Sequence, residues 1–487
     1  MFSFSHAFDF YLILMSCSGV ILGIMWGAMP GLSTTMAMAL LVGLTYGIPT
    51  DAAVSFMLGT FTGSVYGGVI SAILINIPGT SDAVPTMIAG FPLAKRGQAG
   101  LVLGVIITVS MISYWAGYFL LVVGAPFVID IALKFSSWEV GLLAIWGVAV
   151  TGTLTVDEAP VKGWISGWLG LLIALVGREA IFGVERFSFG ILDLSQGISY
   201  LPVLIGLFGL TEIFVVLSEP SPYLMPQKIG KVFPALGLII RYWKSITRSV
   251  IVGLIVGVMP GAGADVACWF SYKLGERVTK RNFADGDMEG VICSEAADKA
   301  ELGGALLPTL TLGIPGSAPA AAFLAALAVH GIVVGPTIDV RHPGFLSFIY
   351  GTLAVCNVAL YFLAFALIKP CVKLFSLRRE ILLPIIAVIG VAASFAEKME
   401  MFDIYLMLGF GLIGYAMRKA HFPIGPMILG IILGPMMDEN LRRAMVVLKG
   451  ETLWQILYGR PIGTLMIVVI IITFITGLST KKKTVEA

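Results

Sequence analysis

The chain has 487 residues, of which 58% are hydrophobic and 12% are charged, and its formal net charge is +2. Soluble globular domains carry roughly 25% charged residues, so this composition indicates a membrane protein and leaves no stretch for a soluble domain of any size. The basic residues lie in short segments between apolar runs, as orientation signals do, and give no support to a nucleic-acid partner.

The cysteines and histidines show no pattern that indicates chemistry. The five cysteines are scattered, odd in number and mostly within apolar stretches, which favours packed thiols over disulfides or metal ligands. The four histidines have no metal-ligand spacing, and the sequence offers no Ser-His-Asp or Cys-His arrangement. We therefore predict neither an enzyme nor a bound cofactor.

The charge-free run from Phe10 to Thr50 is too long for one membrane span and long enough for two segments. Pro30-Gly31 near its middle predicts a break, because proline clashes with the preceding helical turn and glycine lets the chain change direction. No Lys or Arg precedes the run, which favours a retained first span over a cleaved signal. The residues that follow the break are natural N-caps of a new helix: Ser33, Thr34 and Thr35.

A second charge-free run covers Ala52 to Ser81, and the four-residue spacing of its glycines allows close helix packing in lipid. It ends in a second break, Asn76-Ile77-Pro78-Gly79-Thr80. The basic segment from Gly90 to Gly100 then indicates a loop or helix end at a membrane surface. Further spans are predicted at 101–129, 138–156, 160–176 and 200–217, with an exposed loop over 178–199.

The middle of the chain carries the clearest orientation signal. Between Glu219 and Ser249, five basic residues stand against one acidic residue, so the positive-inside rule predicts a cytoplasmic linker. The N-terminus lacks Lys and Arg before the first span, which predicts that it lies outside. The two halves would then enter the membrane from opposite sides, as in the inverted topology of many secondary transporters.

The second half follows the same plan. The charge-free run from Ser249 to Ala264 is short and lies between basic clusters, which favours a re-entrant hairpin broken at Met259-Pro260-Gly261 over a full span. A polar interval over 279–301 leads into Leu302 to Val329, which is broken at Pro315-Gly316. Later spans are predicted at 345–368, 381–396, 402–417, 424–437 and 461–480, and Lys481 to Lys483 predict a cytoplasmic C-terminus.

The breaks recur in the same order, which indicates an internal duplication. GIMWGAMPGLS (Gly23 to Ser33) reappears in the second half as GLIVGVMPGAG (Gly253 to Gly263), and NIPGT around Pro78 reappears at nearly the same offset as GIPGS around Pro315. We predict an all-α polytopic membrane protein of about 12 segments in two inverted repeats. Its predicted divisions are a first repeat (1–217), a basic linker (218–248), a second repeat (249–460) and a final span with a basic tail (461–487).

Broken helices at membrane depth indicate a binding site. Irregular backbone persists there only where it is buried in protein or lines a wet cavity. A half-helix that starts after a break offers free N–H groups and a positive dipole end to an anion such as a carboxylate, while the carbonyls before the break suit a sodium ion. A lone Pro-Gly is more often a packing kink, but the ordered recurrence favours a site. Residues that could supply oxygen ligands to such a site lie near the breaks: Ser33, Thr34, Thr35, Asn76, Thr80, Ser81, Thr309, Thr311 and Ser317.

Charged residues near the second pair of breaks allow two interpretations. Asp265 follows Gly261 by four residues and could receive a proton or a cation, but a helix cap or a surface pair with Lys273 is slightly favoured. Glu295 and Lys299 have the spacing of a helical ion pair. Together with Asp298 and Glu301, they favour a salt-bridged helix end at the membrane interface.

Several of these stretches resemble the large membrane subunit of the bacterial tripartite tricarboxylate transporters. The resemblance covers almost the whole chain. In the first half it rests on MPGLSTT, TYGIP, YGGVISAILINIPGT and GFPLAKRGQA. In the second half it rests on MPGAGADVACWFSY, GGALLPTLTLGIPGSAPAAAFLAAL and HGIVVGP.

The resemblance implies a secondary transporter that imports a carboxylate across the bacterial inner membrane, driven by sodium or protons. It implies two partners, a small membrane subunit and a periplasmic binding protein. A possible sodium position lies near Thr34, Thr35, Thr309 and Thr311. The implied substrate site comprises Pro30, Gly31, Ser33, Asn76, Pro78, Gly79, Thr80, Pro260, Gly261, Gly263, Pro315, Gly316 and Ser317.

One departure from the family pattern concerns the residues that follow Glu295. The family often has two asparagines there, whereas this chain has Asp298 and Lys299, which leaves the usual substrate or coupling ion open. A passive channel, an integral membrane enzyme and a purely structural membrane subunit are the alternatives to a transporter. A membrane enzyme should show clustered acids or histidines near the midplane, and a channel would need no coupling ion.

Overall fold

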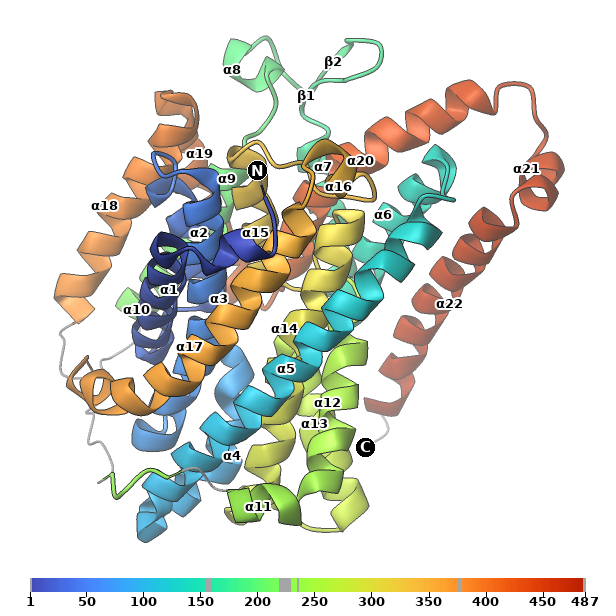
Figure 1. Cartoon of the computed structure of the whole chain (residues 1–487). Coiled ribbons are helices and arrows are strands. Elements are labelled where there is room, and N and C mark those ends of the chain that lie inside the picture. Colours follow the sequence, from blue (N-terminus) through green and yellow to red (C-terminus); the bar gives the residue numbers. More distant parts are fainter. Residues whose placement is uncertain (1, 155–159, 219–228, 234–235, 375–378, 485–487) are drawn as a thin grey trace.

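The computed structural model describes residues 2–154, 160–218, 229–233, 236–374 and 379–484, and most of them are helical (Figure 1). Glu219 and Lys228 of the predicted linker lie outside the described residues. The long helices run between two ends of the molecule. Figure 1 shows the N-terminus at the upper end, and both the C-terminus and the segment after the linker at the lower end.

The first half contains two broken helices, one long helix and three further segments. After the short turn η1 (Ser5–Phe8), its elements are α1 (Phe10–Ala28), α2 (Thr34–Leu44), α3 (Thr50–Ile75), η2 (Ser81–Ala83), α4 (Val84–Leu93), the π-helical η3 (Ala94–Gln98), α5 (Ala99–Ala132), α6 (Ser137–Leu154), α7 (Pro160–Ala174), α9 (Tyr200–Leu204), the π-helical η4 (Ile205–Leu210) and α10 (Thr211–Ser218).

The second half repeats this order of broken helices, long helix and three further helices. Its elements are α11 (Leu236–Arg241), α12 (Trp243–Val258), α13 (Gly263–Thr279), η5 (Phe283–Asp285), α14 (Met288–Leu312), α15 (Ala318–Val329), α16 (Ile338–Arg341), α17 (Phe345–Leu374), α18 (Arg379–Lys398), α19 (Met401–Lys419) and α20 (Ile424–Val447). Two additional helices follow, α21 (Leu453–Gly459) and α22 (Pro461–Thr484).

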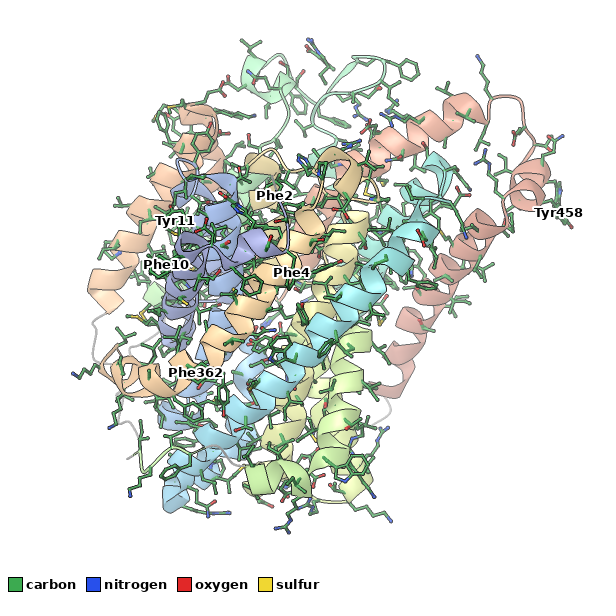
Figure 2. All side chains as sticks on the ribbon, viewed as in Figure 1. Phe2, Phe4, Phe10, Tyr11, Phe362 and Tyr458 are labelled. Atoms are coloured by element: carbon green, nitrogen blue, oxygen red, sulfur yellow. The ribbon has the colours of Figure 1, made fainter. Side chains whose placement is uncertain are left out.

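The predicted spans correspond to helices of the structure. Among the described residues, six segments are long and apolar enough to cross a membrane, and several shorter apolar helices accompany them, among them α2 and α15. Figure 2 shows aromatic side chains on the outer surface, including Phe10, which is 80% exposed, and Phe362, which is 66% exposed. Lipid is the environment in which such a surface is stable. The chain is therefore an all-α polytopic membrane protein.

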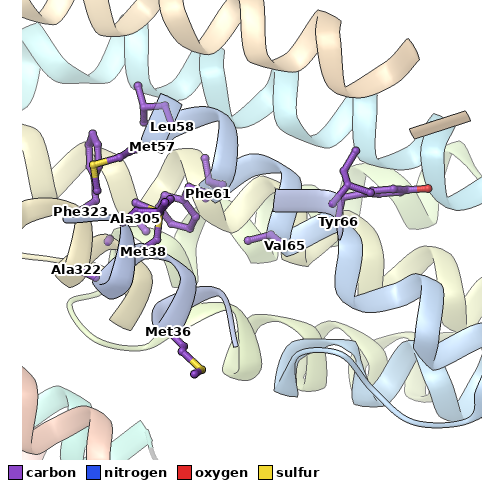
Figure 3. Packing of buried hydrophobic residues seen from close by; sticks show 14 of the residues in the cluster. Met36, Met38, Met57, Leu58, Phe61, Val65, Tyr66, Ala305, Ala322 and Phe323 are labelled. Carbon is purple, nitrogen blue, oxygen red and sulfur yellow. The ribbon is translucent and has the colours of Figure 1, made fainter. Parts of the chain in front are cut away.

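Close backbone contact between broken helices forms the core, as the glycine spacing predicted. α1 packs along α3, and a Cβ atom added at Gly23 would lie 2.4 Å from the carbonyl oxygen of Thr60. α12 packs along α14 in the same way, because a Cβ at Gly253 would lie 2.1 Å from the carbonyl oxygen of Ala297. Figure 3 shows how buried apolar side chains, such as Met38 and Phe323, fill the space around α3.

The segment predicted as an exposed loop over 178–199 has structure of its own. It contains the antiparallel strands β1 (Gly177–Arg178) and β2 (Glu185–Arg186) and the short helix α8 (Leu192–Ser195). Arg186 forms a bidentate pair with Asp438 of α20, at 2.7 and 3.0 Å. Such fork-shaped pairs are among the stronger hydrogen bonds, so the loop is docked on the helical body.

Candidate functional site

The first break of each repeat has the same backbone geometry. α1 is followed by Met29 with φ −82° and ψ 119°, and α12 by Met259 with φ −78° and ψ 120°. The glycine two positions later has a positive φ in both, 87° at Gly31 and 68° at Gly261, which a residue with a side chain adopts rarely. The repeated sequence therefore folds into a repeated bend.

The helices that follow these bends start differently. Ser33 is the N-cap of α2, as predicted, and its hydroxyl accepts a hydrogen bond from the N–H of Met36 at 3.1 Å. α13 begins at Gly263 after Ala262, without a side-chain cap. Asp265 lies in its first turn and is exposed. Lys273, which was considered as a surface partner of Asp265, pairs with Glu276 at 2.8 Å.

The second breaks also correspond. The C-cap residues that follow α3 and α14 are Asn76 and Gly313, and both have the left-handed conformation, with φ 58° and 71°. Asn76 is exposed, whereas Thr80 and Ser317 at the far ends of the breaks are buried. Neither the Thr80 nor the Ser317 hydroxyl has a hydrogen-bond partner among the described residues. Ser317 is the N-cap residue of α15, yet its hydroxyl leaves the first turn of that helix uncapped.

Within each repeat the two breaks touch. A Cβ added at Gly79 would lie 2.0 Å from the carbonyl oxygen of Gly27, the penultimate residue of α1. A Cβ at Gly316 would lie 2.5 Å from the carbonyl oxygen of Gly257, the penultimate residue of α12. In the second repeat the N–H of Gly261 also donates to the carbonyl of Pro315 at 3.2 Å. The two breaks of each repeat therefore lie in direct contact.

The two repeats meet through the segments that follow the breaks. α2, which follows the first break of the first repeat, packs against α15, which follows the second break of the second repeat. Reciprocally, η2 packs against α13. Because each contact joins one repeat to the other, the four breaks surround a shared region in the interior.

The hydroxyls of Thr34, Thr309 and Thr311, which were suggested for sodium, have structural partners. Thr309 and Thr311 donate to the carbonyls of Ala305 and Leu307 in their own helix, and Thr309 also accepts from the N–H of Gly316 at 3.4 Å. The Thr34 hydroxyl accepts from Ser64 of α3 at 2.7 Å. Thr35 is buried. These contacts hold the bends in place, and the sodium position stays a prediction.

The charged residues of α14 are buried and do not lie at the predicted helix end. Glu295, Asp298, Lys299 and Glu301 are at most 3% exposed and lie inside a continuous helix enclosed by α3, α4, α5, α12 and α13. The predicted helix end at the membrane interface is therefore wrong. Hydropathy places charges at surfaces, but inside this helix Lys299 pairs with Glu295 and Asp298.

Lys299 is the centre of this buried cluster. Its ammonium Nζ lies 3.1 Å from Glu295 Oε2, contacts the Asp298 carboxylate and donates to the carbonyl of Val65 at 3.1 Å. The predicted Glu295–Lys299 pair is thus present. Thr86 of α4 donates to Oε1 of Glu295. Val65 belongs to α3, so the ammonium joins the first repeat to the second.

Two further acidic residues lie in this region: Asp82, which the sequence did not single out, and Glu301, which it assigned only to the salt-bridged helix end. Asp82 lies in η2, two residues after Thr80, and is 7% exposed. Glu301 faces the Ser317 hydroxyl and interacts electrostatically with Asp82 and Asp265. One available signal was that Glu301 directly precedes the charge-free run that contains the Pro315-Gly316 break.

This architecture defines a class of membrane protein. Pairs of interrupted helices that converge on a buried polar region are typical of secondary transporters, whose binding sites use half-helix ends and unwound backbone. The chain belongs to the tripartite tricarboxylate transporter TctA family, whose model matches residues 13–429. It is therefore a transporter component and not an enzyme.

Two proteins of Agrobacterium vitis are similar to the chain. An uncharacterized 52.8 kDa protein in the TAR-I ttuC' 3' region is 31% identical over 478 residues, which cover 95% of this chain and 93% of that protein. An uncharacterized protein in the TAR-II ttuC' 3' region is 31% identical over 201 residues, 41% of this chain and 83% of that protein. No solved structure matches the chain significantly.

Proposed function

We propose that this chain is the substrate-translocating subunit of a secondary transporter that imports a di- or tricarboxylate across the bacterial inner membrane. One observation carries the proposal. Thr80 and Ser317 occupy corresponding positions after the second breaks, and both hydroxyls are buried without a hydrogen-bond partner among the described residues. A buried polar group without a partner is costly, so a bound carboxylate would stabilise both positions.

The half-helices add electrostatic support. α2 has 11 residues and α15 has 12, and each begins directly after a break, so its first N–H groups and positive dipole end face the region between the repeats. A carboxylate is the ligand that such helix ends favour. Ser33 and Ser317 lie at these helix starts and Gly263 begins α13, whereas the prolines and the remaining glycines shape the bends.

The arrangement of the ends supports the inverted topology. α1 starts near the N-terminus at one end of the molecule, and α12 starts beside α11 at the other end (Figure 1). The positive-inside rule assigns the α11 end to the cytoplasm, together with the C-terminus. We propose that the opposite end faces the periplasm and receives the substrate from a binding protein. The small membrane subunit is the second proposed partner.

Alanine substitution at Ser317 tests the site. We expect Ser317→Ala to raise the KM for the transported carboxylate about tenfold, the loss of a charge-assisted hydrogen bond of about 1.5 kcal/mol. The measurement is initial uptake of labelled citrate, malate, succinate and phthalate by cells that express the chain with its neighbouring genes. Thr80→Ala should act in the same direction.

The control is Ser195→Ala, since Ser195 is a half-buried residue of α8, which is remote from the breaks. Equal amounts of all variants in the membrane must be verified by immunoblot. Unchanged KM values for both Ser317→Ala and Thr80→Ala would contradict the proposed site. Uptake that rises linearly with concentration would instead favour a channel.

A further inference from the structure

The environment of Lys299 resembles that of a bound inorganic cation. Two carboxylates and one backbone carbonyl surround the ammonium, and the side chain is 0% exposed. An ammonium has three N–H donors, and these three oxygen acceptors match them. Hard inorganic cations prefer the same kinds of oxygen ligand. The Lys299 ammonium therefore occupies the position that an inorganic cation would take, and it cannot dissociate because it is covalently attached to the chain.

Glu301 lies two residues further along α14 and outside this arrangement. It is 3% exposed, and its Oε1 atom has no hydrogen-bond partner among the described residues. The charged groups that face it from other elements are Asp82 of η2 and Asp265 of α13, and both are acidic. The Ser317 hydroxyl also faces it, but Ser317 Oγ makes no hydrogen bond of acceptable geometry.

Burial makes an ionised Glu301 expensive. Transfer of a charge into the protein interior costs several kcal/mol unless a partner compensates for it. Lys299 is engaged by Asp298 and Glu295, and Tyr114 of α5 and Cys268 of α13, which face the same cluster, bring no positive charge. Glu301 must therefore be neutralised by a proton or by an added cation while it stays buried.

The position of Glu301 connects it to both breaks of the second repeat. Its backbone carbonyl packs against Gly257, just before the Met259-Pro260-Gly261 bend, where an added Cβ would lie 2.5 Å away. Its side chain faces Ser317, at the end of the other break. A change in the charge of Glu301 therefore acts directly on the region where an anionic substrate is proposed to bind.

We propose that Glu301 carries the proton that drives uptake, and that Lys299 replaces the mobile inorganic cation as a tethered one. This inference rests on the proposed transport function. A proton from the outer side binds the Glu301 carboxylate, which removes a negative charge beside the carboxylate substrate. On the inner side the substrate leaves and the proton passes from Glu301 to water. No covalent bond to the substrate is formed or broken.

Measuring two transport modes distinguishes a role of Glu301 in proton coupling from a purely structural role. Liposomes containing the full chain and its small membrane subunit are tested with labelled citrate, malate, succinate and phthalate. The first mode is accumulation driven by a pH gradient, and the second is exchange of internal for external substrate at equal pH. Accumulation requires that Glu301 release its proton in each cycle, whereas exchange does not.

For Glu301→Gln, which mimics the protonated state, we expect accumulation to fall at least tenfold and exchange to stay within twofold of the wild-type rate. Glu301→Asp keeps a titratable carboxyl group and should retain accumulation. Glu276→Gln is the matched control, because Glu276 pairs with Lys273 on α13 away from Ser317, and both modes should be unchanged. Wild-type accumulation should not require sodium.

Four results would overturn the inference. The first is equal loss of both modes in correctly assembled Glu301→Gln protein. The second is wild-type accumulation that depends on a sodium gradient and is indifferent to pH, which would assign the neutralising role at Glu301 to sodium. If Glu301→Gln does not assemble, proton entry into wild-type liposomes is measured with a trapped pH indicator during substrate uptake. Substrate entry without proton entry is the third result that would contradict the proposal. Wild-type liposomes that neither accumulate nor exchange any of the four acids would contradict the proposed function, and the inference with it.

Discussion

Replacing Lys299 by methionine is expected to lower the free energy of unfolding by about 3–5 kcal/mol, the usual effect of removing one partner of a buried ion pair. The change leaves the Asp298 and Glu295 carboxylates next to each other in the interior without their cation. It also removes the hydrogen bond to the Val65 carbonyl, which links α14 to α3. We expect a markedly lower midpoint of thermal unfolding for the purified protein and a smaller assembled fraction after extraction.

A double variant provides the control for this prediction. Asp298→Asn combined with Lys299→Asn removes one negative and one positive charge, so the net charge of the cluster is unchanged. Two neutral amides can hydrogen-bond to each other and to Glu295, and we expect the double variant to be clearly more stable than Lys299→Met. A Lys299→Met protein that unfolds at the wild-type temperature would show that the ammonium does not hold the cluster together.

Replacing Gly79 by alanine is expected to reduce uptake more than tenfold. The new Cβ atom would lie 2.0 Å from the carbonyl oxygen of Gly27 and 2.8 Å from the Cα of Gly68, so only a shift of backbone can accommodate it. Overpacking of this kind costs about 1–3 kcal/mol, and more where the neighbour is rigid backbone. The shift would move Thr80, the adjacent candidate ligand.

The corresponding change in the second repeat should have a similar effect, because a Cβ at Gly316 would lie 2.5 Å from the carbonyl oxygen of Gly257. Gly409→Ala in α19 is the matched control, since no atom lies within 4 Å of its added Cβ. The variants are compared with the wild type by their initial rates of uptake, normalised to the amount of protein in the membrane. Wild-type rates in both Gly79→Ala and Gly316→Ala would show that the close contact between the breaks is dispensable.

Local sequence signals predicted most of the fold. Charge-free runs located the spans, and Pro30-Gly31 and Pro315-Gly316 located the breaks, because proline and glycine act on the residues beside them. Ser33 was recognised as a helix N-cap for the same reason. The four-residue glycine spacing also predicted close helix contacts, although it could not identify α1 and α3 as partners.

Long-range contacts could not be predicted in this way. The packing of α2 on α15 joins segments from opposite halves of the chain, and no local pattern encodes it. The burial of Lys299 was missed because a hydropathy argument treats each charge alone, whereas the cost of burial depends on partners such as the Val65 carbonyl. The docking of Arg186 on Asp438 was missed for the same reason.

The measurement that tests the proposed coupled carboxylate transport most directly is the concentration dependence of wild-type uptake. Labelled citrate, malate, succinate and phthalate would be supplied to cells that express the chain with its neighbouring genes, with the proton gradient intact or collapsed. We predict saturable accumulation of at least one acid above its external concentration, which is lost when the gradient is collapsed. Entry of every acid in proportion to its concentration, without accumulation under either condition, would contradict a coupled carboxylate transporter.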